Sequence, residues 1–335
     1  MDYRKPAPAL FRLAGPFEDF VLNLPWLNIV LFLVTLVTMV IAGTYLSNYD
    51  FDMYRFWILF TSDKWMWLDG IPFAVALLAI LGSHELGHYF LSRYHCVNCS
   101  LPYFLPGPNI VGTFGAVILM KSPMPDRRAL FDIGAAGPLT GFVVATFCLV
   151  VGFMTADVQY FYPGQHLQGM VVFQPNLILG IFWKFWPLAR PETMAPAFGM
   201  PPVGPILNSP FLDAACVGYL VTTLNLLPIG QLDGGHIAYS VLGKKSKWLA
   251  IAVLLMLAFF GAYLWFPWLF FAVFLFIIFG RKGFVHPPPY NPYVKLGWGR
   301  KLMAAVVLVV FVFIIAPVPV SIVDPASIPY LFSVK

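Results

Sequence analysis

The sequence predicts an all-α, polytopic membrane protein with about six to seven transmembrane helices and a small β-hairpin or strand region between the second and third helices. Of its 335 residues, 60% are hydrophobic and only 10% are charged, whereas a soluble domain carries about 25% charged residues. The hydrophobic residues also form long runs, and about 20 consecutive apolar residues are enough for a helix to cross a membrane. The composition therefore excludes a soluble protein.

Seven apolar runs are the predicted spanning helices. In chain order they are Leu27–Leu46, Pro72–Tyr94, Ala129–Phe153, Leu212–Leu227, Trp248–Trp265, Trp268–Phe279 and Leu302–Ala316. Pro267 separates the fifth run from the sixth, because proline lacks the amide hydrogen that would continue a helix. The sixth run is short, so we expect it to be tilted or to cross only half of the membrane.

Three stretches between these runs do not have the pattern of a spanning helix. Residues 100–120 are interrupted by prolines and glycines, and the β-branched residues around Ile110–Met120 favour strands or a hairpin. Such backbone is tolerated at membrane depth only where protein covers it or where it lines a cavity. Within 154–210, Leu177–Trp186 is a candidate short interfacial helix. The Pro-rich stretch Phe284–Gly299 is predicted to be an extended cytosolic connector.

Charged residues in the loops predict the orientation of the chain. Lys and Arg are enriched in the cytosolic loops of membrane proteins. Arg4, Lys5 and Arg12 precede the first apolar run, and further Lys and Arg residues occur in alternate loops. We therefore expect the N-terminus in the cytosol and the C-terminus outside. The net charge of +5 comes from these short groups, so no nucleic-acid partner is expected.

The second predicted helix contains the H-E-x-x-H motif His84-Glu85-Leu86-Gly87-His88. Residues four apart share one face of a helix, so His84 and His88 can bind one metal ion while Glu85 lies close to a metal-bound water. A charged side chain at the centre of a membrane helix costs about 2.5–3.5 kcal/mol. This cost favours a functional role over the alternative, a polar cluster that satisfies neighbouring helices.

A catalytic zinc ion usually has three protein ligands and a water, so two histidines leave one ligand missing. The candidate is Asp233, which follows a proline- and glycine-interrupted apolar run and precedes two glycines that allow close backbone approach. At 1.5 Å per residue, His84 lies roughly 18 Å from the outer end of its helix. This depth is compatible with Asp233 at the cytosolic end of the fourth predicted helix. His236 is the alternative ligand.

Zn²⁺ held in this way would lower the pKa of its bound water and polarise a substrate carbonyl, and Glu85 would accept the proton from that water. A peptide bond within a membrane helix is protected by its own hydrogen bonds, so the substrate must unwind. The strand-like residues Gly112, Thr113, Phe114 and Gly115 would then pair with it as an added strand, unless they form a purely structural hairpin. Asn225 would contact the substrate carbonyl or the water, or else pack between helices.

Further polar residues have less specific patterns. Cys96 and Cys99 form a C-x-x-C just after the H-E-x-x-H helix. A second zinc site or a redox site would explain this pair, but no other Cys or His pair has matching spacing. His95, at the end of the same helix, and His286, in the Pro-rich connector, are expected to be ordinary interfacial residues.

The motifs resemble those of the site-2 proteases, a family of intramembrane zinc metalloproteases. The family's H-E-x-x-H corresponds to His84–His88 and its N-x-x-P-x-x-x-L-D-G to Asn225–Gly234, with G-T-F-G-A at Gly112–Ala116 and a family-like Gly134–Pro138 between them. The resemblance covers about residues 72–245. It implies that Asp233 is the third zinc ligand and that Glu85 is the catalytic base. It also implies a single-span membrane protein as substrate, often trimmed first by an upstream site-1-type protease, whose cleavage releases a regulatory domain.

The chain is accordingly expected to have three parts. Residues 1–71 form an N-terminal cytosolic segment, the first transmembrane helix and an external loop. Residues 72–245 form the catalytic core, and residues 246–335 form C-terminal helices with the Pro-rich connector. We expect a compact member of the family, without a PDZ or nucleotide-binding domain. It would be a multi-pass protein surrounded by lipid, in a prokaryotic inner or plasma membrane; its oligomeric state is not predicted.

Two other functions are compatible with parts of the pattern. Buried His, Glu and Asp residues also occur in ion- or proton-conducting transporters, but here they cluster at one depth, whereas a pore would spread them along its length. An inactive member of the family would bind membrane segments without cutting them. The presence of Glu85 argues against this function, because a binding protein has no need of a catalytic base.

Overall fold

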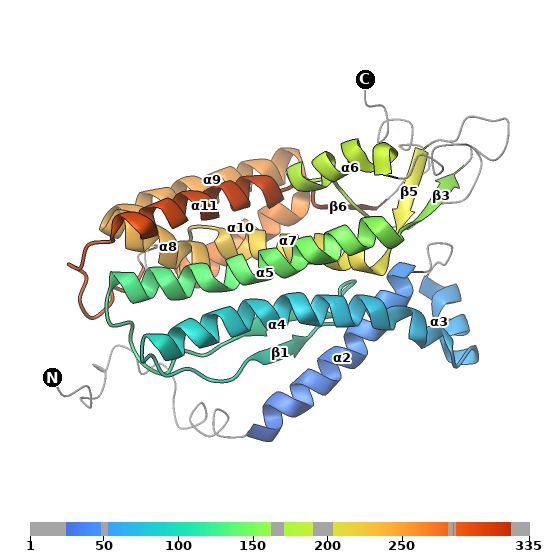
Figure 1. The fold of residues 1–335 in the computed structure, drawn as a ribbon, viewed down its shortest axis with the longest axis horizontal. Coiled ribbons are helices and arrows are strands. Elements are labelled where there is room, and N and C mark those ends of the chain that lie inside the picture. Colours follow the sequence, from blue (N-terminus) through green and yellow to red (C-terminus); the bar gives the residue numbers. More distant parts are fainter. Residues whose placement is uncertain are drawn as a thin grey trace.

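The computed structural model describes residues 25–47, 53–161, 171–189, 204–280, 284 and 286–322. These residues are mostly helical. Most of their long helices run lengthwise, side by side, in an elongated bundle, and α2 (Pro25–Ser47) lies obliquely against it (Figure 1). Arg4, Lys5 and Arg12 lie outside the described residues, so the cytosolic location of the N-terminus stays a prediction.

Each predicted apolar run corresponds to a helix. These helices are α2 (Pro25–Ser47), α4 (Ile71–Tyr94), α5 (Arg127–Thr155), α7 (Pro210–Leu226), α9 (Ser246–Tyr263), α10 (Phe266–Phe279) and α11 (Trp298–Ile314). Four helical stretches of the described chain are long and apolar enough to cross a membrane, namely Trp26–Ser47, Met66–Tyr94, Arg127–Thr155 and Asp233–Tyr263. The polytopic helical class is therefore supported, whereas a count of six to seven spans stays a prediction.

Several short helices lie between these runs. The expected helix in the 154–210 region is α6 (Leu177–Ala189). Three others were not expected: α3 (Met53–Ser62), the 3-10 turn η2 (Met66–Gly70) that leads into α4, and α8 (Asp233–Leu242). A further 3-10 turn, η4 (Gly243–Lys245), joins α8 to α9. Gly230 and Gly243 have positive φ angles of 57° and 61° and lie just outside the two ends of α8, which explains why α8 is separate from α7 and α9.

The strand region expected between the second and third helices is present. β1 (Tyr103–Pro106) and β2 (Thr113–Val117) form an antiparallel hairpin. Two further antiparallel pairs were not expected: β3 (Asp157–Phe161) with β5 (Gly204–Asn208), and β4 (Val171–Phe173) with β6 (Val320–Ile322). The β4–β6 pair joins the chain after α11 to the segment between α5 and α6, at one end of the bundle (Figure 1). Both segments are predicted to be external.

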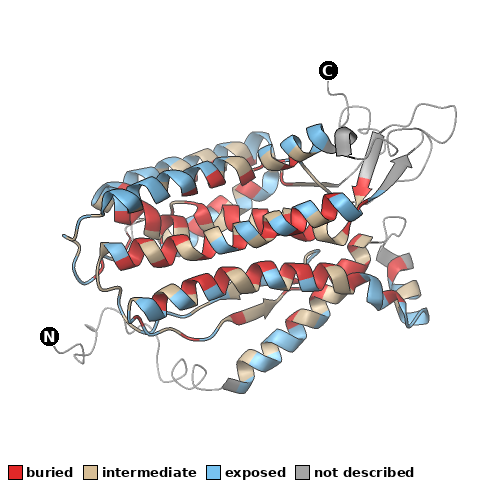
Figure 2. Ribbon diagram, in the orientation of Figure 1, coloured by how far each residue is buried: buried red, intermediate tan, exposed pale blue. Residues whose placement is uncertain are grey.

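Helices α4, α5 and α7 make the buried centre of the bundle. In Figure 2, buried residues (red) alternate along these helices with exposed ones (pale blue). Glycines let these helices approach closely: a Cβ atom on Gly87 of α4 would lie 2.8 Å from the Ala136 carbonyl of α5. A Cβ atom on Gly218 of α7 would meet Ile80 of α4 at the same distance. Such small residues are typical of contacts between membrane helices. The outer faces of α9 and α11 carry exposed apolar side chains, as expected for lipid-facing surfaces.

Candidate metal centre

The two histidines of the H-E-x-x-H motif lie one turn apart on α4, and Asp233 lies at the start of α8. The Nε2 atoms of His84 and His88 are 3.1 Å apart. Oδ2 of Asp233 lies 3.2 Å from Nε2 of His84 and 3.3 Å from Nε2 of His88. Both histidines are buried, with 3% and 7% of their surface exposed. The structure thus brings together the three residues that the sequence suggested as metal ligands.

The spacing of these three atoms tests whether they fit a metal ion. Ligand atoms at about 2.0–2.1 Å from a tetrahedral zinc would lie about 3.3–3.4 Å from one another. The three observed separations of 3.1, 3.2 and 3.3 Å are close to this value. Among the described residues, this is the one group of three His, Cys, Asp or Glu side chains close enough to share an ion. The donor set and its spacing fit zinc.

α5 orients His88 from the other side. Nδ1 of His88 donates to the carbonyl oxygen of Ile133 at 2.7 Å, which leaves Nε2 free for a metal; such hydrogen bonds commonly hold metal-binding histidines. A Cβ atom at Gly137 would lie 2.1 Å from Nε2 of His88, and one at Gly141 would lie 3.2 Å from His84. The glycines of α5 therefore make room for both imidazoles.

α8 is fixed at both ends. At its start, a Cβ atom on Gly234 would lie 2.0 Å from the Leu226 carbonyl oxygen, so only glycine allows the turn after α7 to fold back this tightly. At its other end, Nε of Arg127 donates to the Ser240 carbonyl at 2.9 Å and Nη2 donates to the Val241 carbonyl at 3.2 Å. These carbonyls lie in the last turn of α8, where helix partners are missing. Asp233 also occupies the positive end of the α8 dipole, which favours its charged carboxylate.

Glu85 and Asn225 lie beside the three candidate ligands, His84, His88 and Asp233. Glu85, next to His84 on α4, is buried, with 6% of its surface exposed. Asn225, in the last turn of α7, places Nδ2 3.3 Å from Nε2 of His84. The amide therefore points into the group of ligands and does not pack on a lipid-facing surface.

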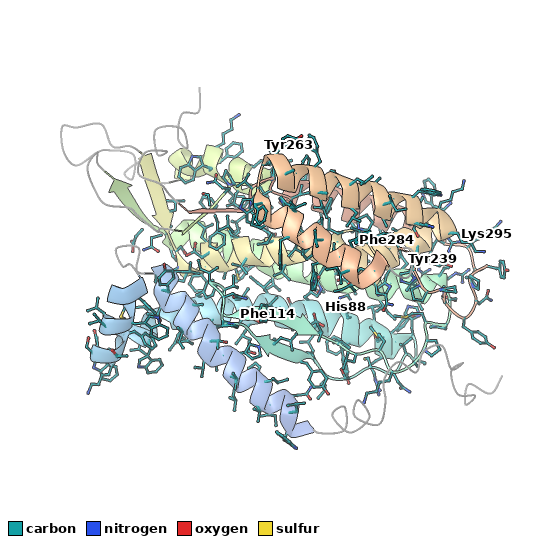
Figure 3. The ribbon with its side chains drawn as sticks, turned by 180° about the vertical axis from the view of Figure 1, so that it is seen from behind. His88, Phe114, Tyr239, Tyr263, Phe284 and Lys295 are labelled. Atoms are coloured by element: carbon teal, nitrogen blue, oxygen red, sulfur yellow. The ribbon has the colours of Figure 1, made fainter. Side chains whose placement is uncertain are left out.

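The β1–β2 hairpin is held against α2 and lies alongside α4 (Figure 3, which labels Phe114 and His88). Oγ1 of Thr38 donates to the Gly112 carbonyl at 2.6 Å. Gly112 has a φ of +79°, and a Cβ atom there would lie 2.4 Å from the Thr38 carbonyl oxygen, so the position requires glycine. Oγ1 of Thr113 donates to the Leu105 carbonyl at 2.7 Å and accepts from the Gly115 amide at 2.9 Å. Phe114 between them is 68% exposed.

His236, the alternative third ligand, is engaged elsewhere. Its Nδ1 lies 2.6 Å from Nε2 of His286, whose ring also packs on Tyr239 with centroids 5.0 Å apart. The expectation that His286 is an ordinary interfacial residue is wrong, because only 6% of its surface is exposed. Burial, with a smaller effect of His236, lowers the pKa of His286 to about 3. Sequence reasoning missed the pair because 50 residues separate its members.

His95 also has a more specific position than expected. Its Nε2 lies 2.9 Å from Oδ2 of Asp132, a residue of α5. Asp132 in turn accepts from Nε and Nη2 of Arg300 in α11 at 2.7 and 2.6 Å. The signal that sequence reasoning overlooked is the charge itself, because Asp132 and Arg300 both lie in or beside predicted membrane helices.

Cys96 and Cys99 do not join a metal cluster in the described part of the chain. Both are free thiols; Cys96 is exposed and Cys99 half-buried. Partial burial raises the pKa of the Cys99 thiol, which makes it a poorer ligand and nucleophile at neutral pH. A second zinc site at this pair therefore gains no support.

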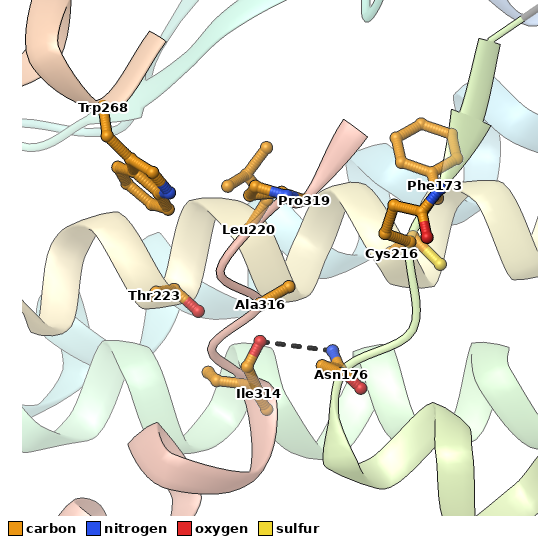
Figure 4. A pocket seen from close by; sticks show the side chains of 10 residues that line it. Phe173, Asn176, Cys216, Leu220, Thr223, Trp268, Ile314, Ala316 and Pro319 are labelled. Carbon is orange, nitrogen blue, oxygen red and sulfur yellow. Dashed lines mark hydrogen bonds between the residues drawn. The ribbon is translucent and has the colours of Figure 1, made fainter. Parts of the chain in front are cut away.

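A small cavity lies on another side of α7, between this helix, α10 and the chain that follows α11 (Figure 4). Thr223, Asn176 and Trp268 are among its lining residues. Thr223 and Asn225 are two residues apart on α7, and about 200° of helix rotation separates them. They consequently face opposite sides of the helix, and the cavity is distinct from the metal centre.

Comparisons with known proteins agree with the motifs. Residues 72–266 match the family described as Peptidase family M50. The probable chloroplastic zinc metalloprotease EGY1 of Arabidopsis thaliana is 29% identical over 252 residues, which cover 74% of this chain and 43% of that protein. The probable chloroplastic zinc metalloprotease EGY2 of the same plant is 31% identical over 182 residues, covering 53% and 30%. The corresponding EGY1 of Oryza sativa subsp. japonica is 31% identical over 201 residues, covering 59% and 33%. The chain thus spans less than half the length of these relatives.

Proposed function

This chain belongs to peptidase family M50, the site-2 protease family, and from that premise we propose that it is an intramembrane zinc metalloendopeptidase. The observation that carries the proposal is the set of His84, His88 and Asp233, whose ligand atoms have the mutual spacing of zinc ligands. These residues lie in a bundle that includes membrane-length helices. The curated relatives named as zinc metalloproteases support the same activity.

The residues around the ligands supply the proton transfers and the binding of the carbonyl. A zinc ion bound to the three side chains supplies a Lewis acid and a water that is nucleophilic at neutral pH. We assign Glu85 as the general base that accepts the proton of the attacking water and delivers it to the leaving amine. Asn225, whose amide lies 3.3 Å from His84, would donate a hydrogen bond to the substrate carbonyl oxygen as negative charge develops on it.

The β1–β2 hairpin suggests how the substrate is held. In the described part of the chain, β2 pairs only with β1, so its second edge has no strand partner there and could take an added strand. Gly115 has open space where a side chain would be, and Phe114 is exposed beside it. An unwound substrate segment that paired with Thr113–Val117 would be held through its backbone, independently of its sequence. Gly112, by contrast, contacts α2 and supports the hairpin.

The proposed substrate is the transmembrane segment of a single-span protein, cleaved in regulated intramembrane proteolysis, often after an upstream site-1-type protease has trimmed it. This part of the proposal rests on the family and on the location of the site within a membrane-type bundle. The multi-pass membrane location follows from the same observations. The names of the plant relatives place them in chloroplasts, which does not favour the expected prokaryotic plasma membrane.

A cleavage assay with detergent-purified protein tests the proposal. A generic single-span substrate is incubated with the wild type and with Glu85→Gln, and the zinc content of both proteins is determined. Asp69→Asn, which neutralises an exposed carboxylate before α4, is the control. We expect about one zinc in all three proteins, cleavage by the wild type and the control, and a loss of activity of at least 10²-fold in Glu85→Gln.

Persistent cleavage by Glu85→Gln would refute the assigned role of this residue. A wild-type protein that binds no zinc would refute the metalloprotease and favour an ion-conducting function of the buried cluster.

A further inference from the structure

The C-terminal segment 286–301, which comprises most of the Pro-rich connector and the start of α11, contacts the two elements that support the metal ligands. One contact is the ion pair of Arg300 with Asp132, in which two nitrogens of the guanidinium bind the two carboxylate oxygens at 2.7 and 2.6 Å. Such paired hydrogen bonds are stronger and more directional than a single one. Only 17% of the Asp132 side chain and 32% of the Arg300 side chain are exposed.

Asp132 connects Arg300 to the first side of the metal centre. The next residue, Ile133, provides the carbonyl that holds Nδ1 of His88 at 2.7 Å. Asp132 itself binds His95, the residue that directly follows α4, seven residues after His88. The turn of α5 that contains Asp132 and Ile133 therefore makes two contacts, one with His88 of α4 and one with His95 just after α4. Arg300 of α11 binds the same turn through Asp132.

His286 connects the same C-terminal segment to the second side of the metal centre. Its Nε2 lies 2.6 Å from Nδ1 of His236, one helical turn after Asp233 on α8. A Cβ atom at Gly134 of α5 would lie 2.8 Å from Cβ of His236 and 3.3 Å from the Asp233 carbonyl oxygen. His236 therefore lies between α5 and His286, on the same turn of α8 as Asp233.

The connector between these two contacts is also attached to the core. The amide of Tyr290 donates to the Met124 carbonyl at 2.8 Å, and the amide of Asn291 donates to the Pro125 carbonyl at 2.9 Å. Nε of Arg128 donates to the Lys295 carbonyl at 3.3 Å. The backbone of the connector thus follows the start of α5, and both end contacts are held in fixed positions relative to that helix.

We propose that segment 286–301 is a clamp that sets the distance between the histidine pair of α4 and Asp233 of α8. Arg300 and His286 are its positioning residues: Arg300 acts on His88 through Asp132 and the Ile133 carbonyl, and His286 acts on Asp233 through His236. The inference rests on the proposed zinc site and gives a role to a part of the chain that carries no predicted metal ligand. It predicts that zinc affinity depends on residues that do not touch the metal.

The test measures zinc affinity by competition with a chelator, using the full-length protein in detergent. Arg300→Gln removes the ion pair, and Lys301→Gln removes an exposed charge from the same turn of α11 as a matched control. Substitutions beyond the direct ligands commonly weaken metal binding by about 10–100-fold. We expect about tenfold weaker binding for Arg300→Gln and for His286→Ala, and wild-type affinity for Lys301→Gln.

Combined substitutions distinguish a clamp from a general loss of stability. Arg300 and Asp132 belong to one chain of contacts, so Arg300→Gln with Asp132→Asn is expected to weaken zinc binding about as much as the stronger of the two single variants. Arg300 and His286 act on different ligands, so the losses of Arg300→Gln and His286→Ala are expected to multiply. Wild-type zinc affinity in both Arg300→Gln and His286→Ala would overturn the proposal.

If Arg300→Gln fails to fold, as judged by the loss of a thermal unfolding transition, Arg300→Lys takes its place. Lysine keeps the charge but cannot form the two parallel hydrogen bonds, so we expect weaker zinc binding than in the wild type, and an unchanged affinity would overturn the clamp. A wild type that binds zinc but cleaves nothing contradicts the proposed function, while the clamp is still decided by the zinc affinities of the variants.

Discussion

Two regions of this bundle are packed in different ways. Around the metal centre, α4, α5 and α8 meet through glycines, and the space between them is occupied by His, Asp and backbone carbonyls. The α9–α10 pair instead packs Leu, Ala and Trp side chains together with Leu227 and Ile229, and none of the described buried residues of the two helices is ionisable. A glycine contact in the first region fixes the geometry of polar atoms, whereas one in the second sets only the distance between two helices. The same substitution should therefore have different consequences in the two regions.

The largest expected effect is the loss of a ligand from the first region. Asp233→Ala removes the oxygen that lies 3.2 and 3.3 Å from the two imidazoles, and two remaining ligands are too few for a stable zinc site. We expect zinc content to fall from about one per molecule to nearly none, with loss of cleavage. Elemental analysis of the purified variant provides the measurement. Full zinc occupancy would show that the third ligand is another residue, and His236 would be tested next.

A matched pair of glycine substitutions compares the two regions directly. A Cβ atom at Gly137 would lie 2.1 Å from Nε2 of His88, and one at Gly261 of α9 would lie 2.1 Å from the Leu269 amide nitrogen of α10. Both clashes require a shift, at a cost of about 1–3 kcal/mol in stability. Gly137→Ala must displace His88, a proposed zinc ligand, so we expect it to lose zinc and activity. Gly261→Ala is expected to lower the melting temperature and keep zinc.

Gly180→Ala is the control for this pair, because no atom of the described residues lies within 4 Å of the added methyl group. Its zinc content is expected to match that of the wild type. Its melting temperature is expected to be the same or slightly higher, because alanine is more favourable than glycine inside an exposed helix by about 0.5–1 kcal/mol. Equal zinc contents in Gly137→Ala and Gly261→Ala would mean that glycine packing in the two regions does not differ in function.

The difference between the regions also explains which features the sequence could predict. The motif residues were predicted because their evidence is local: His84 and His88 are one turn apart, and Asp233 follows a break in an apolar run. The use of Gly134 and Gly137 depends on which helix faces them, and only the structure shows this. His286 was misjudged because a Pro-rich segment has no periodicity that indicates which side chains are buried. The three-residue strands β4 and β6 are likewise too short to show alternation.

The number of spans was hard to predict for a related reason. α7 has 17 residues and α10 has 14, less than the roughly 20 that a perpendicular span requires. The apolar stretch Asp233–Tyr263 is interrupted at Gly243, where the backbone has a positive φ and turns between α8 and α9. Hydropathy detects apolar composition, but it does not show where a helix bends or ends inside an apolar run.

A smaller effect, on kcat and not on zinc content, is expected for Asn225, on the face of α7 that contacts the metal centre. Asn225→Ala removes an amide that lies 3.3 Å from His84 but is not a ligand, so zinc content should be unchanged. If this amide stabilises the developing charge on the substrate carbonyl, kcat should fall by about 10²–10³-fold. Thr223→Val is the control on the opposite face, where the buried Thr223 hydroxyl has no hydrogen-bond partner among the described residues. Its kcat should stay within about twofold of the wild type, since removing an unpaired buried hydroxyl is close to neutral. Equal kcat values for the two variants would assign Asn225 to helix packing and leave the carbonyl without this donor.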